Sequence, residues 1–450
     1  MAEAKDIHDS LEFLRYFEKY TESEDLLGVV QHKMEQNAAS LDLIRHELSE
    51  ADCQLLADLA PLARLKILNL RETRLTTAGL QHLCISPHLT GLDELIIDNN
   101  NVDDDGLFFI SKVKTFARLK KLSVASNEIG PVGAKALALS QTLTGLERLD
   151  LSYNRVKALG IQAIAGSALG SRLKGLNLTD TGIGDEGLQK IAEGAPMERL
   201  ESLDLSDNHL TDRGLEFLSR SEVFPHLKML IFDNNHVGDD GIYALAESSL
   251  GSQLETLHLK NNGLTADSAL SLAQSKTLTR LKSLDLNNND LRAEGTAALA
   301  QSENLKHLER LDLGENQLNA EGVKALANSP HLTRLKYLRL NDNNVADEGV
   351  VALAHSKTLT QIEELHLEQD NWIHAQGAKA IAESENLSGL RVLALGLNVI
   401  GDEGAHYLAD SKCLDQLVFL DVIGNKLTAA GEDMLRHSEN LSNLKTLELV

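Results

Sequence analysis

The sequence predicts an α/β solenoid, a curved stack of repeated strand-and-helix units, and three observations lead to this prediction. A pattern of leucines, Leu-x-x-Leu-x-Leu-x-x-Asn-x-Leu, returns every 27 residues. Within each unit, alternating apolar and polar residues predict a half-buried strand, and apolar residues at helical spacing then predict a helix. Leucine accounts for 86 of the 450 residues. A fixed period of this length is typical of proteins in which each unit packs against its neighbours.

The strands and helices are expected in strict alternation along the chain. From Leu68 the strand leucine recurs every 27 residues to residue 447, with a single step of 28 residues between Leu365 and Leu393. This spacing predicts about 16 units over residues 41–450. Strands stack about 4.8 Å apart, whereas helices pack no closer than about 8–10 Å, so the stack must bend. We therefore expect a horseshoe with parallel strands on its concave face and helices on its convex face.

Three positions recur within the units. Glycine stands early in the helix in 13 of 14 full units, with Ser268 as the exception, which predicts a close approach of neighbouring backbone because glycine costs about 1 kcal/mol in a helix. Serine closes the helix in 12 of 14 units. Asparagine fills the turn after the strand in 12 of 14 units, with Thr73 and Thr181 as exceptions. We expect its amide to pair with buried backbone groups of that turn.

Residues 1–40 precede the repeats and are expected to form a helical N-terminal cap. A capping box, Thr21-Glu-Ser-Glu, and a stripe of Ile7, Leu11 and Leu14 at helical spacing support this interpretation. An F-box is the alternative, although the Leu-Pro opening of that motif is missing. We expect a monomer. Because the chain stops on a predicted strand without a covering helix, a truncated chain and end-to-end dimerisation are the alternatives.

These repeats resemble those of leucine-rich-repeat proteins, and the strand-plus-helix unit is most similar to the ribonuclease-inhibitor-like subfamily. The resemblance covers residues 41–450 and implies a concave protein-binding face. The chain departs from ribonuclease inhibitors in having three cysteines and a nearly uniform period. Segments such as Ile183-Gly-Asp-Glu-Gly-Leu and Ile400-Gly-Asp-Glu-Gly-Ala look more like bacterial repeat proteins, some of which are effectors delivered into host cells.

Composition excludes several classes of partner and location. With 43 Lys+Arg and 67 Asp+Glu the formal charge is −24, which argues against binding to nucleic acid or to an anionic membrane. Cys53, Cys84 and Cys413 are too few and too far apart for a disulfide framework or a zinc site. The first residues lack the apolar core of a secretion signal. We expect a cytoplasmic protein, or one secreted into a host cytosol if it is an effector.

The concave face is predicted to be acidic. Four positions per unit point inward, and over 14 units these 56 positions carry 15 acidic and six basic residues. Charges that line a concavity steer oppositely charged partners toward it, so the predicted ligand is a protein with a basic surface. The alternative is that aspartate is simply favoured beside a turn. The predicted acidic contact residues are Asp150, Asp204, Asp207, Asp233, Asp285, Asp312, Glu315 and Glu368.

A second group of candidate contact residues is apolar or aromatic. Phe419 is expected on the open face, where it forms an apolar patch with its neighbours, and Trp372 lies in the single 28-residue unit. An irregular unit that exposes an aromatic residue is typical of an interface hot spot. The alternative is that Trp372 fills the space made by the additional residue. The predicted contact residues of this group are Tyr337, Trp372, Leu397, Phe419 and Ile423.

The sequence predicts no enzyme, and no cofactor, metal or catalytic residue is assigned. His258 and His366 are expected to point inward but lie four units apart, and no hydrolase, phosphate-loop, metalloprotease or calcium-loop motif occurs. The predicted function is therefore that of a protein-interaction scaffold: an inhibitor, an adaptor or an effector. The alternative is a regulator of a small GTPase, because the repeats are also similar to leucine-rich-repeat GTPase activators.

Overall fold

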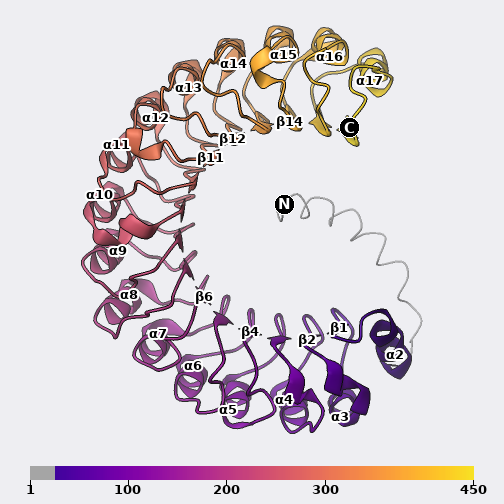
Figure 1. Cartoon of the computed structure of the whole chain (residues 1–450), viewed down its shortest axis with the longest axis vertical. Helices are drawn as coiled ribbons and strands as arrows, with labels where there is room; N and C mark the ends of the chain where they lie inside the picture. The colour runs from indigo at the N-terminus through magenta and orange to yellow at the C-terminus, as the bar shows by residue number, and fades with distance from the viewer. Residues whose placement is uncertain (1–25, 450) are drawn as a thin grey trace.

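The protein is a curved solenoid built on one continuous parallel sheet (Figure 1). The structure, a computed structural model, describes residues 26–449. In this part of the chain 16 strands follow one another in sequence order across the sheet, from β1 to β16. The strands line the inside of the arc and the helices its outside (Figure 1). The predicted fold class is therefore confirmed, with its concave strand face and convex helical face.

Each strand is three residues long; α2 precedes β1, and from β1 to β15 each strand is followed by the helix of its unit. The strands are β1 Ser40–Asp42, β2 Ile67–Asn69, β3 Glu94–Ile96, β4 Lys121–Ser123, β5 Arg148–Asp150, β6 Gly175–Asn177, β7 Ser202–Asp204, β8 Met229–Ile231, β9 Thr256–His258, β10 Ser283–Asp285, β11 Arg310–Asp312, β12 Tyr337–Arg339, β13 Glu364–His366, β14 Val392–Ala394, β15 Phe419–Asp421 and β16 Thr446–Glu448. The helices are α2 Leu26–Gln36, α3 Glu50–Asp58, α4 Thr77–Cys84, α5 Asp104–Lys112, α6 Pro131–Ala138, α7 Lys157–Ala165, α8 Gly184–Ala192, α9 Asp212–Ser219, α10 Asp239–Glu247, α11 Ala266–Gln274, α12 Arg292–Ala300, α13 Asn319–Ala327, α14 Ala346–Ala354, α15 Ala375–Ala382, α16 Gly401–Ala409 and α17 Ala429–Arg436.

The repeat length sets the register of the sheet. The central leucine of each strand pairs with the central leucine of the next, as Leu284 of β10 pairs with Leu311 of β11. Leu284 is 1 % exposed and Leu311 is fully buried, so the leucines form a continuous core between sheet and helices. Residues at the same position of neighbouring repeats point to the same side of the sheet. The residue after each central leucine therefore also forms a column across the sheet.

The asparagines of the turns form a ladder of buried hydrogen bonds, as predicted. In one unit Asn316 is fully buried, and its Nδ2 donates to the carbonyl oxygens of Leu286 at 2.8 Å, Leu313 at 3.2 Å and Gly314 at 2.8 Å. Its Oδ1 accepts a hydrogen bond from the backbone nitrogen of Leu291 at 3.3 Å. The amide thus satisfies backbone groups of two adjacent units that would otherwise be buried without partners.

The recurrent glycines and serines hold adjacent helices together. A Cβ on Gly241 would lie 2.7 Å from Oδ1 and 3.0 Å from Cα of Asp212, at the start of the preceding helix α9. The expected close approach is therefore present, and it involves side chains as well as backbone. Ser302 and Ser356, at the ends of their helices, donate hydrogen bonds to carbonyl oxygens of the preceding unit at 2.7 Å and 2.6 Å.

At the N-terminal end α2 packs beside β1, with Leu26, Val29 and Val30 buried. The capping box at Thr21 and the stripe of Ile7, Leu11 and Leu14 lie outside the described residues. The division into a cap at residues 1–40 and a solenoid at residues 41–450 stays a prediction. No helix within residues 26–449 combines the length and the apolar character needed to cross a bilayer.

Candidate protein-binding face

The column of residues at the strand ends forms the centre of the concave face. Asp285 of β10 pairs in register with Asp312 of β11, so these two carboxylates are direct neighbours across the sheet. Asp204 of β7 is separated from Asp285 by Ile231 and His258. Asp150 of β5 lies further along the column and is separated from Asp204 by Asn177. The structure thus brings two of the predicted aspartates together and keeps the other two apart.

These aspartates also have a role in the fold. Oδ1 of Asp285 accepts a hydrogen bond from the backbone nitrogen of Asn287 at 2.9 Å, and Oδ1 of Asp312 accepts one from Gly314 at 3.0 Å. The same contact joins Asp150 to Ser152 at 2.9 Å and Asp204 to Ser206 at 3.0 Å. Such a side-chain acceptor two residues before the nitrogen stabilises the turn that follows the strand.

The hydrogen bond to the turn supports the alternative that aspartate is favoured at this position for the fold, but it uses only Oδ1 of each carboxylate. Within residues 26–449 no hydrogen bond reaches Oδ2 of Asp204, Asp285 or Asp312. Asp150 differs, because its Oδ2 accepts a hydrogen bond from Asn177 at 3.1 Å. The free oxygens are available to a ligand with hydrogen-bond donors.

Partial burial on the concave face disfavours the charged form of these carboxylates. Burial raises the pKa of Asp312 to about 6, and the neighbouring charge of Asp285 adds to the effect. Burial likewise raises the pKa of Asp285. It also raises the pKa of Asp233, where the charge of Asp204 contributes. A cation placed against this group would favour the ionised carboxylates and relieve their mutual repulsion.

Unpartnered polar atoms lie beside the aspartate pair. Asn287 is 4 % exposed, and its Oδ1 has no hydrogen-bond partner among residues 26–449. Two strands further on, the same holds for Oε2 of Glu368 and Nε2 of His366, whose Nδ1 lies 3.3 Å from Glu368 Oε1. Buried polar atoms are rarely left without partners, so these atoms are candidates for contact with a ligand.

Tyr337 lies between the two groups and is held by aromatic contacts. The guanidinium of Arg310 stacks 3.8 Å from the centre of the Tyr337 ring, and the His366 ring lies 5.1 Å from it. Burial raises the pKa of Tyr337 to about 12, so the ring keeps its hydroxyl proton. Arg339 follows Asp312 in the column and donates a hydrogen bond to Asn341 at 2.8 Å. The acidic face therefore contains cations near its centre.

The remaining acidic candidates lie next to this column. Asp233 Oδ1 accepts a hydrogen bond from the backbone nitrogen of Lys260 at 2.8 Å. Asp207 and Glu315 occupy the last inward position of their units, with φ of 57° in both, and are partly exposed. Asp207 Oδ2 accepts a hydrogen bond from Asn234 at 3.1 Å.

The predicted apolar group is exposed to different degrees. Trp372 is 56 % exposed and Leu397 is 54 % exposed, whereas Phe419 and Ile423 are half-buried. The alternative in which Trp372 fills the space made by the additional residue is wrong. Trp372 and Leu397 have φ of 52° and 58°, a left-handed conformation that costs a side chain of this kind about 1–2 kcal/mol. Ala394, in the strand next to Phe419, is 3 % exposed and adds little to the surface.

Asp98 and Asp421 are among the acidic residues of the concave face that were not predicted contacts. Burial raises the pKa of Asp421 to about 6, with Glu448 and Glu368 adding to the effect. Burial also raises the pKa of Asp98, whose Oδ1 accepts a hydrogen bond from Ser123 at 2.6 Å. Asp421 stands in the same register as Asp312, so the repeat alignment alone was sufficient to find it.

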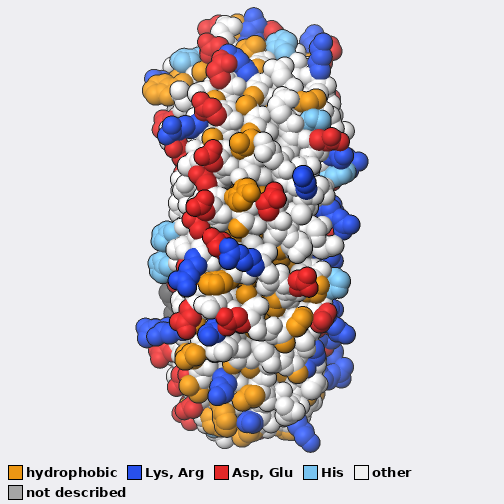
Figure 2. Space-filling model, turned by 90° about the vertical axis from the view of Figure 1, so that its left-hand side faces the viewer, with side chains coloured by type: hydrophobic (Ala, Val, Ile, Leu, Met, Phe, Trp, Pro, Cys, Tyr) orange, Lys and Arg blue, Asp and Glu red, His pale blue; other side chains and the backbone are white. Residues whose placement is uncertain are grey.

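The convex face differs from the concave one. Figure 2 shows acidic and basic side chains interspersed over the helices, with apolar side chains scattered among them. No group of three or more His, Cys, Asp or Glu side chains suited to a metal ion occurs in the described part of the chain.

The fold and the repeats define the class of this protein. The sequence profile of the family described as Leucine Rich repeat matches the chain at residues 119–138, 143–165, 173–192, 200–219, 225–246, 277–300, 304–327, 331–354 and 389–409. Together with the single parallel sheet, these matches show that the chain is a leucine-rich-repeat protein with the α/β solenoid fold. Leucine-rich-repeat proteins generally mediate protein binding.

Several solved structures are similar to this chain. An internalin of Listeria monocytogenes is 20% identical, with 98% of this chain and 95% of the internalin covered and a TM-score of 0.41. A leucine-rich-repeat protein of Leptospira interrogans is 21% identical, with 94% and 98% covered and a TM-score of 0.48. TLR13, in its complex with ssRNA13, is 19% identical, with 86% and 60% covered and a TM-score of 0.48. A search of curated proteins finds no match.

Proposed function

We propose that this protein is a non-enzymatic scaffold whose concave face binds a basic surface of a protein partner. The observation that carries the proposal is the adjacent pair Asp285 and Asp312, whose Oδ2 atoms accept no hydrogen bond from residues 26–449. A lysine or arginine side chain supplies both the positive charge and the donors that these oxygens lack.

Binding of such a side chain is favourable here for two reasons. The carboxylates are already desolvated in the fold, so a ligand does not have to remove all of their water. The ligand also offsets the repulsion between Asp285 and Asp312, which contributes to the raised pKa of Asp312. The remaining acidic residues of the face, such as Asp204 and Asp233, steer a basic partner toward this centre.

The test compares two double variants with equal changes in charge. Asp285→Asn with Asp312→Asn removes the pair, whereas Asp240→Asn with Glu348→Gln removes two exposed acids from the convex helices. With a labelled nona-arginine peptide as the probe, we expect about tenfold weaker binding for the first variant and a much smaller change for the second. Equal losses for the two variants would contradict the proposal.

Ionic strength provides an independent measurement. If the concave face steers its ligand, the association rate of the peptide falls as salt rises from about 0.01 M to 0.15 M, because the Debye length shrinks from about 30 Å to 8 Å. An association rate that does not respond to salt excludes steering.

We also propose that Trp372 and Phe419 contribute to binding of the natural partner. Trp372 is 56 % exposed, and an exposed aromatic residue is typical of an interface hot spot. Trp372→Ala with Phe419→Ala is expected to abolish binding of a partner identified by affinity purification, while the midpoint of thermal unfolding stays unchanged. Unaltered affinity in a calorimetric titration would remove these residues from the interface.

We place the protein in a reducing compartment, either the cytoplasm or the cytosol of a host cell if it is a delivered effector. Its three cysteines are all free, and burial raises the pKa of Cys53 and Cys84 to about 12, which keeps these thiols protonated. Within leucine-rich-repeat proteins, the strand-plus-helix unit supports a ribonuclease-inhibitor-like binding protein. A regulator of small GTPases is the alternative, and a GTP-hydrolysis assay with the identified partner separates the two.

A further inference from the structure

A row of alternating charges runs along the edge of the sheet where the strands begin. The residue two positions before each central leucine is basic in one unit and acidic in the next, from Lys66 to Lys445. The row reads Lys66, Asp93, Lys120, Glu147, Lys174, Glu201, Lys228, Glu255, Lys282, Glu309, Lys336, Glu363, Arg391, Val418 and Lys445. We call this row the charge ladder. Val418 interrupts it at a position where an acid is due.

The charge ladder is held together by ion pairs between adjacent units. Lys174 Nζ lies 3.0 Å from Glu147, and Lys228 Nζ lies 3.2 Å from Glu201. Lys282 Nζ lies 2.7 Å from Glu255. In each of these pairs the basic side chain forms its ion pair with the acidic side chain of the preceding unit. The carboxylate of an intervening strand is thus the group that normally lies between two bases of the ladder.

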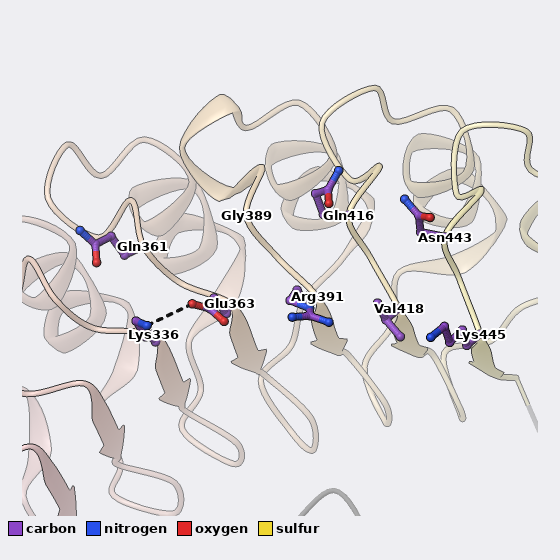
Figure 3. Close-up of a pocket in the computed structure, with 9 residues that line it drawn as sticks. All are labelled: Lys336, Gln361, Glu363, Gly389, Arg391, Gln416, Val418, Asn443 and Lys445. Atoms are coloured by element: carbon purple, nitrogen blue, oxygen red, sulfur yellow. Dashed lines mark ion pairs between the residues drawn. The ribbon is translucent and has the colours of Figure 1, made fainter. Parts of the chain in front are cut away.

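Val418 leaves Lys445 without an acid in the preceding unit, and the ladder has no carboxylate between Arg391 and Lys445. The backbone of Val418 connects it to both neighbours, since its nitrogen donates to Arg391 O at 2.8 Å and its oxygen accepts from Lys445 N at 2.8 Å. Arg391 and Lys445 are exposed and form no ion pair with any residue from 26 to 449. Glu363, the acid before Arg391, pairs with Lys336 at 3.5 Å instead (Figure 3).

A cavity of about 730 Å³ lies at this interruption and is lined by Arg391, Val418 and Lys445. The ion pair of Lys336 and Glu363, the amide side chains of Gln361, Gln416 and Asn443, and Gly389 complete its wall (Figure 3). The corresponding place around Glu201, between Lys174 and Lys228, holds a cavity of only about 300 Å³. The larger cavity therefore coincides with the missing acid.

We propose that this cavity binds a carboxylate side chain of an acidic peptide segment in a partner protein. The carboxylate takes the place between Arg391 and Lys445 that a glutamate of the chain itself takes elsewhere in the ladder. The ladder places the two bases two strands apart, about 10 Å along the sheet, so a single carboxylate entering over Val418 can contact both. The nearby amides supply further donors. This second site has the opposite charge to the concave face and does not depend on the function proposed for that face.

The test uses a labelled peptide, Gly-Glu-Gly-Glu-Gly-Glu-Gly, and its counterpart with Gln in place of Glu, in fluorescence anisotropy at low salt. We expect the wild-type protein to bind the Glu peptide about fivefold more tightly than the Gln peptide. Val418→Glu supplies the missing acid and is expected to remove this preference. Lys445→Gln is expected to weaken binding about threefold, as the loss of one exposed ion pair. Lys174→Gln, at a base whose carboxylate is present, is the matched control and keeps the preference.

A variant that gains binding provides a control, because a misfolded protein would lose binding instead. Glu201→Val opens the ladder between Lys174 and Lys228, and we expect it to add a second site for the Glu peptide in titrations. Equal binding of the Glu and Gln peptides by the wild-type protein, or an unchanged preference in a folded Val418→Glu variant, would overturn the proposal. Competition by inorganic phosphate as strong as that by the peptide would assign the cavity to small anions and would also overturn it.

Discussion

Each aspartate at a strand end accepts a hydrogen bond from the backbone two residues further on, and this contact fixes one of its oxygens. In Asp204, Asp285 and Asp312 the other oxygen accepts no hydrogen bond from residues 26–449. Asp312 shows the consequence at the scale of a single residue, because the turn holds its carboxylate close to that of Asp285 and in a poorly hydrated place. Ionisation of Asp312 therefore destabilises the folded protein, and a bound cationic ligand would reduce this destabilisation.

The raised pKa of Asp312 predicts a pH dependence of stability. Its pKa is about 6 in the folded protein and about 3.9 in an unfolded chain, so ionisation is less favourable in the folded state. The free energy of unfolding should therefore fall as pH rises from about 4 to 6. We expect Asp312→Asn to flatten this part of the profile and to raise stability at pH 7 by about 1–2 kcal/mol.

Urea denaturation at pH 5 and pH 7 measures this effect. Asp239→Asn serves as a comparison, because it is expected to change the free energy of unfolding in the opposite direction. Burial raises the pKa of Asp239, but hydrogen bonds from Ser268 and Thr265 outweigh burial and lower it overall. Asp239→Asn should therefore reduce stability at pH 7. If both variants shift stability in the same direction, the carboxylate of Asp312 is not destabilised by its surroundings.

At the scale of the element, the helices touch so closely that a methyl group matters. The backbone N–H of Gly241 in α10 donates a hydrogen bond to Asp212 Oδ1 at 2.8 Å. A side chain at residue 241 would collide with Asp212. The recurrent glycine therefore reflects helix-to-helix spacing. In α2, by contrast, a Cβ on Gly28 would meet nothing within 4 Å.

This contrast predicts opposite effects of the same substitution. Gly241→Ala should lower the free energy of unfolding by about 1–2 kcal/mol, because crowding outweighs the gain in helix propensity. Gly28→Ala should raise it by up to about 1 kcal/mol, because only the propensity changes. Thermal or urea unfolding of both variants measures the two effects, and stabilisation by Gly241→Ala would show that adjacent helices can separate without loss.

At the scale of the whole molecule, the two candidate sites have opposite charge and lie apart. Asp285 belongs to β10 and Val418 precedes β15, so five strands, about 24 Å along the sheet, separate them. This separation exceeds the Debye length of about 8 Å at physiological salt. The concave face and the charge ladder are therefore expected to act independently.

Independence is testable by crossing the variants and the probes. Val418→Glu should leave the affinity for the basic peptide unchanged, and Asp285→Asn with Asp312→Asn should leave the affinity for the acidic peptide unchanged, both at 0.15 M salt. A cross-effect larger than about twofold in either direction would mean that the sites are coupled through the solenoid.

The repeat, the order of strands and helices and the register of the sheet can all be derived from the amino-acid sequence. A fixed 27-residue step places the same position of successive repeats side by side. The neighbours of Asp312 and the alternation of the charge ladder therefore follow from the sequence alone. Which atoms have no hydrogen-bond or ion-pair partner among residues 26–449 follows only from the folded structure: they are Asn287 Oδ1, Oδ2 of Asp204, Asp285 and Asp312, and the charged groups of Arg391 and Lys445. The folded structure also decided that Trp372 is exposed while Phe419 is half-buried. Burial and hydrogen bonding depend on how side chains from adjacent units meet in space, and a repeating pattern specifies only which side chains are close enough to meet.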